Sequence, residues 1–231
     1  MSGAGDEALE IVRTADADAC ARAAADLVAD AVRGGARHLV LAGGTTPIAA
    51  YALLDAMDLP WDGVHLWYGD ERCVPFDHPD SNHGAVSGVL RAAAATWHPM
   101  PGALGPLAGA DAYATELERD GPPGLAFDLV LNGMGPDGHT ASLFPHHPLL
   151  YVGGLTAGIT DSPKPPPERL TLTLGALNAG ARLVLLVTGA GKAQALARVL
   201  AGPDDGTPSS LLARDRLTVL ADAAALGGED A

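Results

Sequence analysis

Basic residues, cysteine and long apolar runs are all scarce in this chain of 231 residues. Fourteen basic residues, of which only Lys164 and Lys192 are lysines, stand against twenty-eight acidic ones and leave a net charge of −14. That charge repels nucleic acid backbones and anionic membrane surfaces, so neither is expected as a partner. The two cysteines, Cys20 and Cys73, form no CxxC pair. No apolar run approaches about 18 residues, so no membrane span is expected.

The composition is that of a globular protein, with 48% apolar and 18% charged residues. The first ten residues, MSGAGDEALE, have neither the basic nor the apolar region of a secretory signal, so a cytoplasmic location is expected. The length and even composition predict one domain over residues 1–231, present as a monomer or a small homo-oligomer.

Short apolar runs alternate with segments of helical periodicity along the chain. This alternation predicts an α/β fold, a mostly parallel sheet with helices on both faces, whose ligands bind where strands end and loops begin. Proline- and glycine-rich stretches at 99–109, 120–124, 144–168 and 202–208 are interpreted as surface loops. Strands are expected at 38–42, 64–68, 127–131, 170–174, 183–187 and 217–220, and helices at 16–33, 48–57, 81–95 and 192–200.

A glycine turn, Gly43-Gly44-Thr45-Thr46-Pro47, joins the first predicted strand to a helix. Glycine lets the backbone approach a ligand closely, and the start of a helix offers free N–H groups and a positive dipole end. This combination suits a phosphate group. The alternative is a purely structural turn, in which Thr45 or Thr46 caps the helix and Pro47 occupies its first turn.

Three charged residues, Asp70, Glu71 and Arg72, directly follow the strand expected at 64–68. The guanidinium of Arg72 could bind a phosphate or carboxylate through two parallel hydrogen bonds. The two carboxylates could carry protons or pair with Arg72. A solvated ionic turn is the alternative interpretation.

Both lysines lie in segments rich in glycine or proline. Lys164 belongs to SPKPPPER, a run that ends at Arg169, where prolines restrict the loop and limit the entropy lost when its ammonium binds a ligand. A rigid solvent-exposed loop is the alternative. Lys192 ends the segment GAGK, which lacks the first glycine and the Ser or Thr of a nucleotide-binding P-loop and is therefore not one.

The most specific segment is GMGPDGHTASLFP, residues 133–145, which follows the strand expected at 127–131. Its start matches GxGxxG, but Pro145 interrupts the helix that a dinucleotide site requires. Asp137 and His139 lie two residues apart at this glycine turn. A histidine can take a proton from water near neutral pH, and a carboxylate beside it can fix its tautomer. The alternative is a polar turn in which Asp137 caps a helix.

Five segments occur in the order found in the 6-phosphogluconolactonase family, which the chain resembles over roughly residues 39 to 225: AGGTTP, YGDERCVPFDHPDSN, LNGMGPDGHTASLFP, SPKPPPERLTLTL and VTGAGKAQAL. The resemblance implies a Rossmann-like parallel sheet, shared with glucosamine-6-phosphate deaminases and ribose-5-phosphate isomerases. It also implies hydrolysis of 6-phospho-D-glucono-1,5-lactone to 6-phospho-D-gluconate, in the oxidative pentose phosphate pathway, without a metal or other cofactor.

Two alternatives remain open within that resemblance. The deaminase branch typically reads DGHIAFNEP, with a catalytic glutamate, where this chain reads DGHTASLFP, and it has tyrosine in place of Arg72. Both departures favour the lactonase. A catalytically silent sugar-phosphate binder is the other alternative, although such a protein would not need the proton carrier His139.

The expected site combines an anion pocket with one general base. His139 is expected to activate water, Asp137 to orient the imidazole, and glycine-turn N–H groups near Gly135 to stabilise the oxyanion. The substrate-binding residues expected are Gly43, Gly44, Thr45, Asp70, Arg72, Gly135, Lys164 and Arg169, with the phosphate on the first three, flanked by Arg72 and Lys164, and Arg169 as a weaker candidate.

Overall fold

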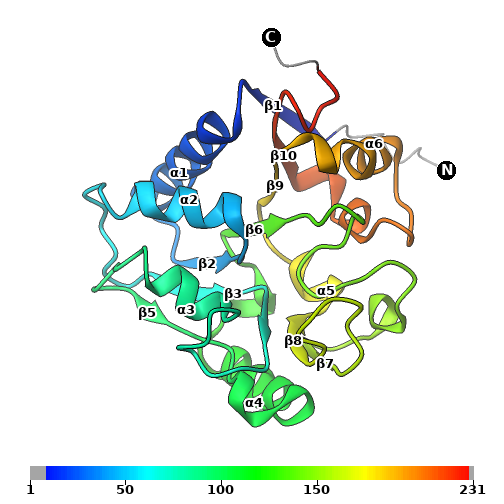
Figure 1. The fold of residues 1–231 in the computed structure, drawn as a ribbon. Coiled ribbons are helices and arrows are strands. Elements are labelled where there is room, and N and C mark those ends of the chain that lie inside the picture. The colour runs from blue at the N-terminus through cyan, green and yellow to red at the C-terminus, as the bar shows by residue number, and fades with distance from the viewer. Residues whose placement is uncertain (1–8, 229–231) are drawn as a thin grey trace, which may run out of the picture.

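The centre of the molecule is a seven-stranded sheet in which every pairing is parallel (Figure 1). The structure, a computed structural model, describes residues 9–228. The strand order is β1-β10-β9-β6-β2-β3-β5. The strands are β1 (Glu10–Thr14), β2 (His38–Leu41), β3 (His65–Tyr68), β5 (Thr96–Trp97), β6 (Leu129–Gly133), β9 (Leu183–Val187) and β10 (Leu217–Asp222). The expected α/β class with a mostly parallel sheet is confirmed.

Helices cover both faces of this sheet. In Figure 1, α1 and α2 lie on one side of it and α6 on the other. The strand β9 reads LVLLV and is buried at every position, as a central strand covered on both faces must be. The helices are α1 (Ala17–Arg33), α2 (Thr45–Leu54), α3 (Asn82–Ser87), α4 (Pro106–Asp120), α5 (Leu174–Leu177) and α6 (Ala193–Ala201). None of those in the described part of the chain has the length and apolar character needed to traverse a bilayer.

Helix α1 illustrates why these segments become helices. The carboxylate of Asp16 accepts a hydrogen bond from the Ala19 N–H at 2.7 Å and caps the first turn. Small and β-branched residues fill its buried face, so the helix packs closely on its neighbours. The buried positions of this helix are Cys20, Ala21, Ala24, Ala25, Val28, Ala29 and Val32.

A second, antiparallel sheet of three strands lies beside the main one. It contains β4 (Asp70–Arg72), β8 (Arg169–Leu172) and β7 (Thr156–Ile159), in the order β4-β8-β7. The strand expected at 170–174 therefore forms, but it belongs to this sheet and not to the parallel one. Because Arg72 is paired with Arg169 in the ladder, the small sheet brings the charged turn after β3 beside the proline-rich loop.

Several boundaries differ from expectation for identifiable reasons. The helix expected at 81–95 ends at Ser87, with Gly88 as its C-cap. The supposed loop 99–109 contains the start of α4, because Pro106 occupies the first turn, where a missing N–H does no harm. The supposed loop 144–168 contains β7. Short 3₁₀ turns cover Gly102–Leu104, Pro123–Leu125, Pro148–Tyr151, Ala190–Lys192, Pro208–Leu211 and Arg214–Arg216.

Four neighbouring strands, β9, β6, β2 and β3, point in the same direction. Their carboxyl ends therefore meet at one edge of the sheet, and the loops that follow them converge there. This is the edge at which open α/β sheets bind ligands.

Candidate active site

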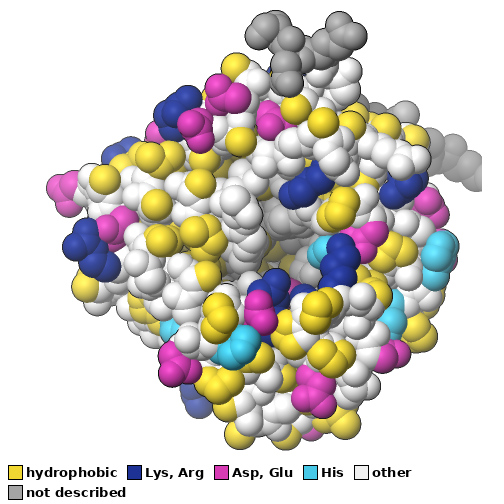
Figure 2. All heavy atoms as spheres, viewed as in Figure 1, with side chains coloured by type: hydrophobic (Ala, Val, Ile, Leu, Met, Phe, Trp, Pro, Cys, Tyr) yellow, Lys and Arg dark blue, Asp and Glu magenta, His cyan; other side chains and the backbone are white. Residues whose placement is uncertain are grey.

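A cavity of about 140 Å³ opens at this edge. Figure 2 shows it as a hollow in the middle of one face, with basic and acidic side chains and histidine at its rim. Each of the four strands contributes the loop that follows it, and the small sheet contributes Arg72 and Arg169. The lining residues are Ala42, Gly43, Gly44, Thr45, Thr46, Pro47, Gly69, Asp70, Arg72, Asn82, Leu131, Asn132, Gly133, Met134, Gly135, His139, Ala141, Arg169, Leu186 and Lys192.

The glycine turn after β2 leads directly into α2. Gly44 has a φ of 101°, a conformation that favours glycine, and it precedes the first helical residue, Thr45. No side chain caps this helix. Within residues 9–228, the backbone N–H groups of Gly43, Gly44, Thr45 and Thr46 donate to no protein acceptor. The first turn of α2 therefore presents free donors and a positive dipole end to the cavity.

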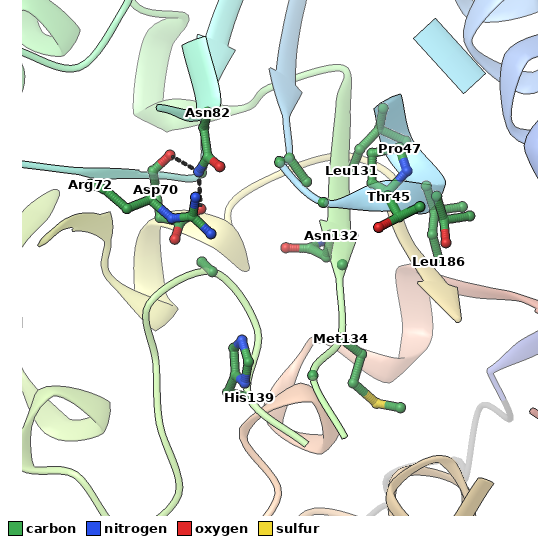
Figure 3. Close-up of a pocket in the computed structure, with 18 of the residues that line it drawn as sticks. Thr45, Pro47, Asp70, Arg72, Asn82, Leu131, Asn132, Met134, His139 and Leu186 are labelled. Carbon is green, nitrogen blue, oxygen red and sulfur yellow. Dashed lines mark hydrogen bonds between the residues drawn. The ribbon is translucent and has the colours of Figure 1, made fainter. Parts of the chain in front are cut away.

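Asn82, at the start of α3, packs directly against this turn. A Cβ on Gly43 would lie 1.9 Å from the side-chain oxygen of Asn82, so only glycine fits there. The Asn82 amide donates to the backbone oxygen of Asp70 at 2.9 Å and to its carboxylate at 3.0 Å. The other carboxylate oxygen of Asp70 accepts from Ser142 Oγ at 2.7 Å. Asp70 thus ties three loops together at the cavity wall, as Figure 3 shows for its bonds to Asn82.

Glu71 is completely buried and anchors the segment that carries Asn82. Its Oε1 accepts from the backbone N–H groups of Arg72 at 2.8 Å and Asn82 at 2.7 Å. Its Oε2 accepts from the His83 N–H at 2.7 Å and the Ser81 hydroxyl at 3.0 Å. All four neighbours donate, so the site is built for a carboxylate. Glu71 therefore has a structural role: it holds the segment that carries Asn82, and it does not itself line the cavity.

The guanidinium of Arg72 points into the cavity (Figure 3). One of its terminal nitrogens, Nη1, donates to the Asp80 carbonyl at 2.5 Å. Its Nε is buried and has no hydrogen-bond partner in the described part of the chain. A buried donor without an acceptor is unfavourable by about 1–3 kcal/mol, so holding the Arg72 guanidinium at the cavity wall has a cost in stability.

His139 and Asp137 lie on the turn after β6, with the imidazole facing the cavity. The Nδ1 of His139 lies 2.5 Å from Asp137 Oδ1. Burial raises the pKa of Asp137, but hydrogen bonds and charges from His139 and Lys164 outweigh it and hold that pKa well below its usual range. Asp137 is therefore an acceptor and Nδ1 carries the proton, so Nε2 is the basic nitrogen.

Gly135 determines how closely the turn can fold around this pair. A Cβ on Gly135 would lie 2.1 Å from the His139 ring and 2.6 Å from Asp137 Oδ1. The N–H of Gly135 itself donates to the His139 carbonyl at 3.0 Å, and stabilisation of the oxyanion by N–H groups near Gly135 stays a prediction. Gly135 lines the cavity, but it contributes space for the imidazole and not a free donor.

The two lysines lie in different parts of the site, although only Lys164 was expected to bind the substrate. The ammonium of Lys164 lies 3.0 Å from Asp137 Oδ2 and 3.2 Å from His139 Nδ1, and Lys164 is not among the lining residues of the cavity. Lys192, which the sequence analysis set aside with the rejected P-loop, is the lysine that lines it. Burial lowers the pKa of Lys192, and the carboxylate of Asp222 opposes part of that shift.

Arg169 lies at the cavity wall but is only 4% exposed. Its guanidinium donates to the carbonyls of Pro166 at 3.0 Å, Lys164 at 3.1 Å and Pro165 at 3.0 Å. It also lies over the Phe144 ring, 5.7 Å from the centroid. Arg169 therefore fixes the proline-rich loop and so helps to hold the ammonium of Lys164 beside Asp137.

Two asparagines of the cavity were missed by the sequence analysis. Asn132 lies at the end of β6, and its amide nitrogen donates to the Val130 carbonyl at 3.3 Å, which leaves its oxygen toward the cavity (Figure 3). Its position at the carboxyl end of a strand is the signal that could have found it. For Asn82 the sequence offers no such signal, because the contact with Gly43 is tertiary.

Proteins of one family resemble this chain over most of its length. The sequence profile of the family described as glucosamine-6-phosphate isomerases/6-phosphogluconolactonase matches residues 13–220. The 6-phosphogluconolactonase of Synechocystis sp. (strain ATCC 27184 / PCC 6803 / Kazusa) is 41% identical over 178 residues, which cover 72% of each chain.

Solved structures share the fold. A 6-phosphogluconolactonase from Trypanosoma brucei aligns with a TM-score of 0.83 at 25% identity, over 95% of this chain and 98% of that one. A monomeric glucosamine-6-phosphate deaminase aligns with a TM-score of 0.81 at 21% identity, over 96% of this chain and 100% of that one. Because both enzymes share the fold, the choice between their reactions rests on the residues of the site.

Proposed function

The chain belongs to the family of glucosamine-6-phosphate isomerases and 6-phosphogluconolactonases, and we propose that it hydrolyses 6-phospho-D-glucono-1,5-lactone to 6-phospho-D-gluconate. The observation that carries this proposal is the His139 imidazole, held by Asp137 and facing a cavity whose other side is the free start of α2. The first feature suits proton transfer and the second suits a phosphate.

The phosphate binds at the first turn of α2. Free N–H groups from Gly43 to Thr46 and the positive end of the helix dipole favour an anion there. Lys192, which follows β9, and Arg72, the last residue of β4, flank it. The chain's net charge of −14 does not oppose this binding strongly, because salt screens exposed charges beyond about 8 Å. In this proposal, Lys192 takes the phosphate contact first expected of Lys164.

His139 is the general base on the attacking water. Its Nε2 removes a proton as the water oxygen bonds to the lactone carbonyl carbon, which gives a tetrahedral intermediate. The Asp137 carboxylate accepts a hydrogen bond from the Nδ1–H group and stabilises the imidazolium that forms. Lys164, on the other oxygen of Asp137, keeps that carboxylate ionised.

The ring oxygen is the leaving group. When the intermediate collapses, the bond from the carbonyl carbon to the ring oxygen breaks and the proton on Nε2 passes to that oxygen, which regenerates neutral His139. The carboxylic acid that results loses its proton to solvent. General base catalysis of about 10²- to 10⁴-fold, together with positioning of the substrate, is sufficient for an ester as reactive as a lactone.

The residue that faces His139 argues against deamination. Phe144 stands where the deaminase segment DGHIAFNEP has its glutamate. The Phe144 ring is buried, and its centroid lies 4.9 Å from that of His139. An apolar ring at this place supplies no second proton carrier beside the imidazole.

The experiment that tests the proposal compares the wild type with His139→Ala. The lactone is generated freshly, and the enzymatic rate is measured above the spontaneous rate. We expect His139→Ala to lower kcat by more than about 100-fold with an unchanged circular dichroism spectrum. His146→Ala, at a histidine whose side chain is 72% exposed, is the control and keeps the wild-type rate. A wild type no faster than the spontaneous reaction would refute the proposal, and ammonia release from glucosamine 6-phosphate would identify a deaminase.

The cellular setting belongs to the same proposal. We place the reaction in the cytoplasm, where thiols stay reduced, and both Cys20 and Cys73 are free thiols. A monomer or a small homo-oligomer is the expected assembly. Size-exclusion chromatography with light scattering measures that assembly directly.

A further inference from the structure

A cluster of histidine and acidic side chains lies beside β3 and the edge strand β5, and none of its residues lines the active-site cavity. His65 is the first residue of β3, and His98 directly follows β5. The two strands are parallel with His65 opposite Thr96, so His98 lies level with Trp67 of β3 and stacks on it. The amino end of β3 is the end remote from the cavity, which opens after Tyr68. Glu116 and Asp120 complete the cluster from α4. The mechanism above uses none of these residues.

The imidazole of His98 is the fixed centre of this cluster. It is 3% exposed and stacks on the indole of Trp67, with the centroids 3.7 Å apart and the planes inclined by 4°. Its Nδ1 lies 2.6 Å from Glu116 Oε1, and its Nε2 lies 2.9 Å from His65 Nδ1. Both ring nitrogens are therefore engaged in defined directions.

The two carboxylates converge on that imidazole. Glu116 and Asp120 are four residues apart on α4, so they project from the same side of the helix and repel each other. One ligand atom from each of His98, Glu116 and Asp120 lies within 4.8 Å of the other two. Arg119 binds Asp120 through a single carboxylate oxygen, Oδ2, at 2.6 Å, which leaves Oδ1 free.

We propose that His98, Glu116 and Asp120 bind a divalent transition-metal ion of the zinc class. An imidazole with two carboxylates is a donor set that suits zinc, whereas calcium and magnesium prefer oxygen ligands alone. The ion replaces the proton that Nδ1 shares with Glu116 and relieves the repulsion between the carboxylates. Water completes the coordination, because the Glu116 and Asp120 side chains are 27% and 33% exposed.

His65 orients the ligand without binding the ion. Metal-bound histidines usually engage their second nitrogen in a hydrogen bond, which fixes the tautomer and the ring orientation. With the ion on Nδ1 of His98, the Nε2 proton points at His65 Nδ1, 2.9 Å away, which accepts it. Trp67 and His65 thus hold the His98 ring in place before any ion arrives.

Calorimetric titration of the untagged, chelator-treated chain with zinc chloride tests this inference. We expect the wild type to bind one equivalent of zinc at this cluster. Each of Glu116→Gln and Asp120→Asn should raise the dissociation constant for that zinc ion by about 10-fold or more. At a zinc concentration 100-fold above the dissociation constant, the melting temperature of the wild type should rise by about 5–10 °C. Both variants replace a carboxylate by an amide of nearly the same shape in side chains that are 27% and 33% exposed, so we expect the fold to remain intact.

Glu118→Gln is the matched control, because it removes the same charge from an exposed position of the same helix. It should bind zinc as the wild type does. If the wild type binds no zinc, or if the double variant Glu116→Gln/Asp120→Asn binds it as tightly as the wild type, the inference is overturned. Lactone hydrolysis serves as an independent readout of folding, since no residue of the cluster lines the active-site cavity.

Discussion

Substituting Gly135 by alanine probes the geometry of the active site with a single added methyl group. The new Cβ would lie 2.1 Å from the Nδ1 and Cε1 atoms of His139, whereas ordinary van der Waals contacts begin near 3.4 Å. The backbone on the other side is tied by the hydrogen bond from the Gly135 N–H to the His139 carbonyl. The imidazole must therefore move by roughly 1 Å, or the turn must open.

A displacement of this size should reduce the rate by about 100-fold, because a catalytic group displaced by 1 Å no longer meets its substrate productively. The loss should appear in kcat. The value of KM should change little, since the phosphate contacts at the start of α2 come from another loop. The hydrolysis of freshly generated lactone, corrected for the spontaneous rate, measures both constants.

The matched control for Gly135→Ala is Gly153→Ala, where an added Cβ meets no atom within 4 Å. This variant should keep the wild-type kcat. If Gly135→Ala also keeps it while the protein remains folded, the placement of His139 and Asp137 does not govern the reaction, and the reasoning is refuted.

Three further predictions concern binding, stability and pH. Arg72→Ala and Lys192→Met should each raise KM by about 10- to 100-fold, because each removes charge-assisted hydrogen bonds to the phosphate. Lys164→Met should mainly lower kcat. If Lys164→Met raised KM and Lys192→Met lowered kcat, the roles assigned to the two lysines would have to be exchanged. Glu71→Gln should destabilise the fold by about 2 kcal/mol or more, since a buried N–H or hydroxyl donor loses its acceptor, and lower the melting temperature by about 4–8 °C. Burial lowers the pKa of Lys192, so its charge is lost at a lower pH than that of an ordinary lysine. Calorimetry should therefore show that the affinity for 6-phosphogluconate falls as the pH rises toward the ordinary lysine range, and Lys192→Arg should abolish that fall.

The alternation of strands and helices was sufficient to predict the parallel sheet and the edge that holds the site. Gly43 and His139 lie at that edge because each follows a strand of the main sheet, and Arg72 lies there because it ends the short strand β4, which comes directly after β3. Their local sequences carry this information. A glycine turn or a charged cluster that follows an apolar run can be recognised from residues that are adjacent in the sequence.

The parts that sequence reasoning missed depend on contacts between distant segments. The strand at 169–172 pairs antiparallel with β4, a partner about 100 residues earlier, and no local pattern distinguishes that sheet from the main one. The roles of Lys164 and Lys192 likewise depend on which loop ends at the cavity and which ends at Asp137. Helix α4 was hidden because Pro106, which begins it, was interpreted as part of a loop.

The central claim is that His139 acts on a substrate whose phosphate is bound on the other side of the cavity. A crystal structure of the chain with bound 6-phosphogluconate, the product, tests this claim most directly. The account predicts that the phosphate lies on the first turn of α2 beside Lys192, with the product carboxylate within hydrogen-bonding distance of His139 Nε2. A phosphate seated instead on Lys164, or a carboxylate beyond the reach of that imidazole, would contradict it.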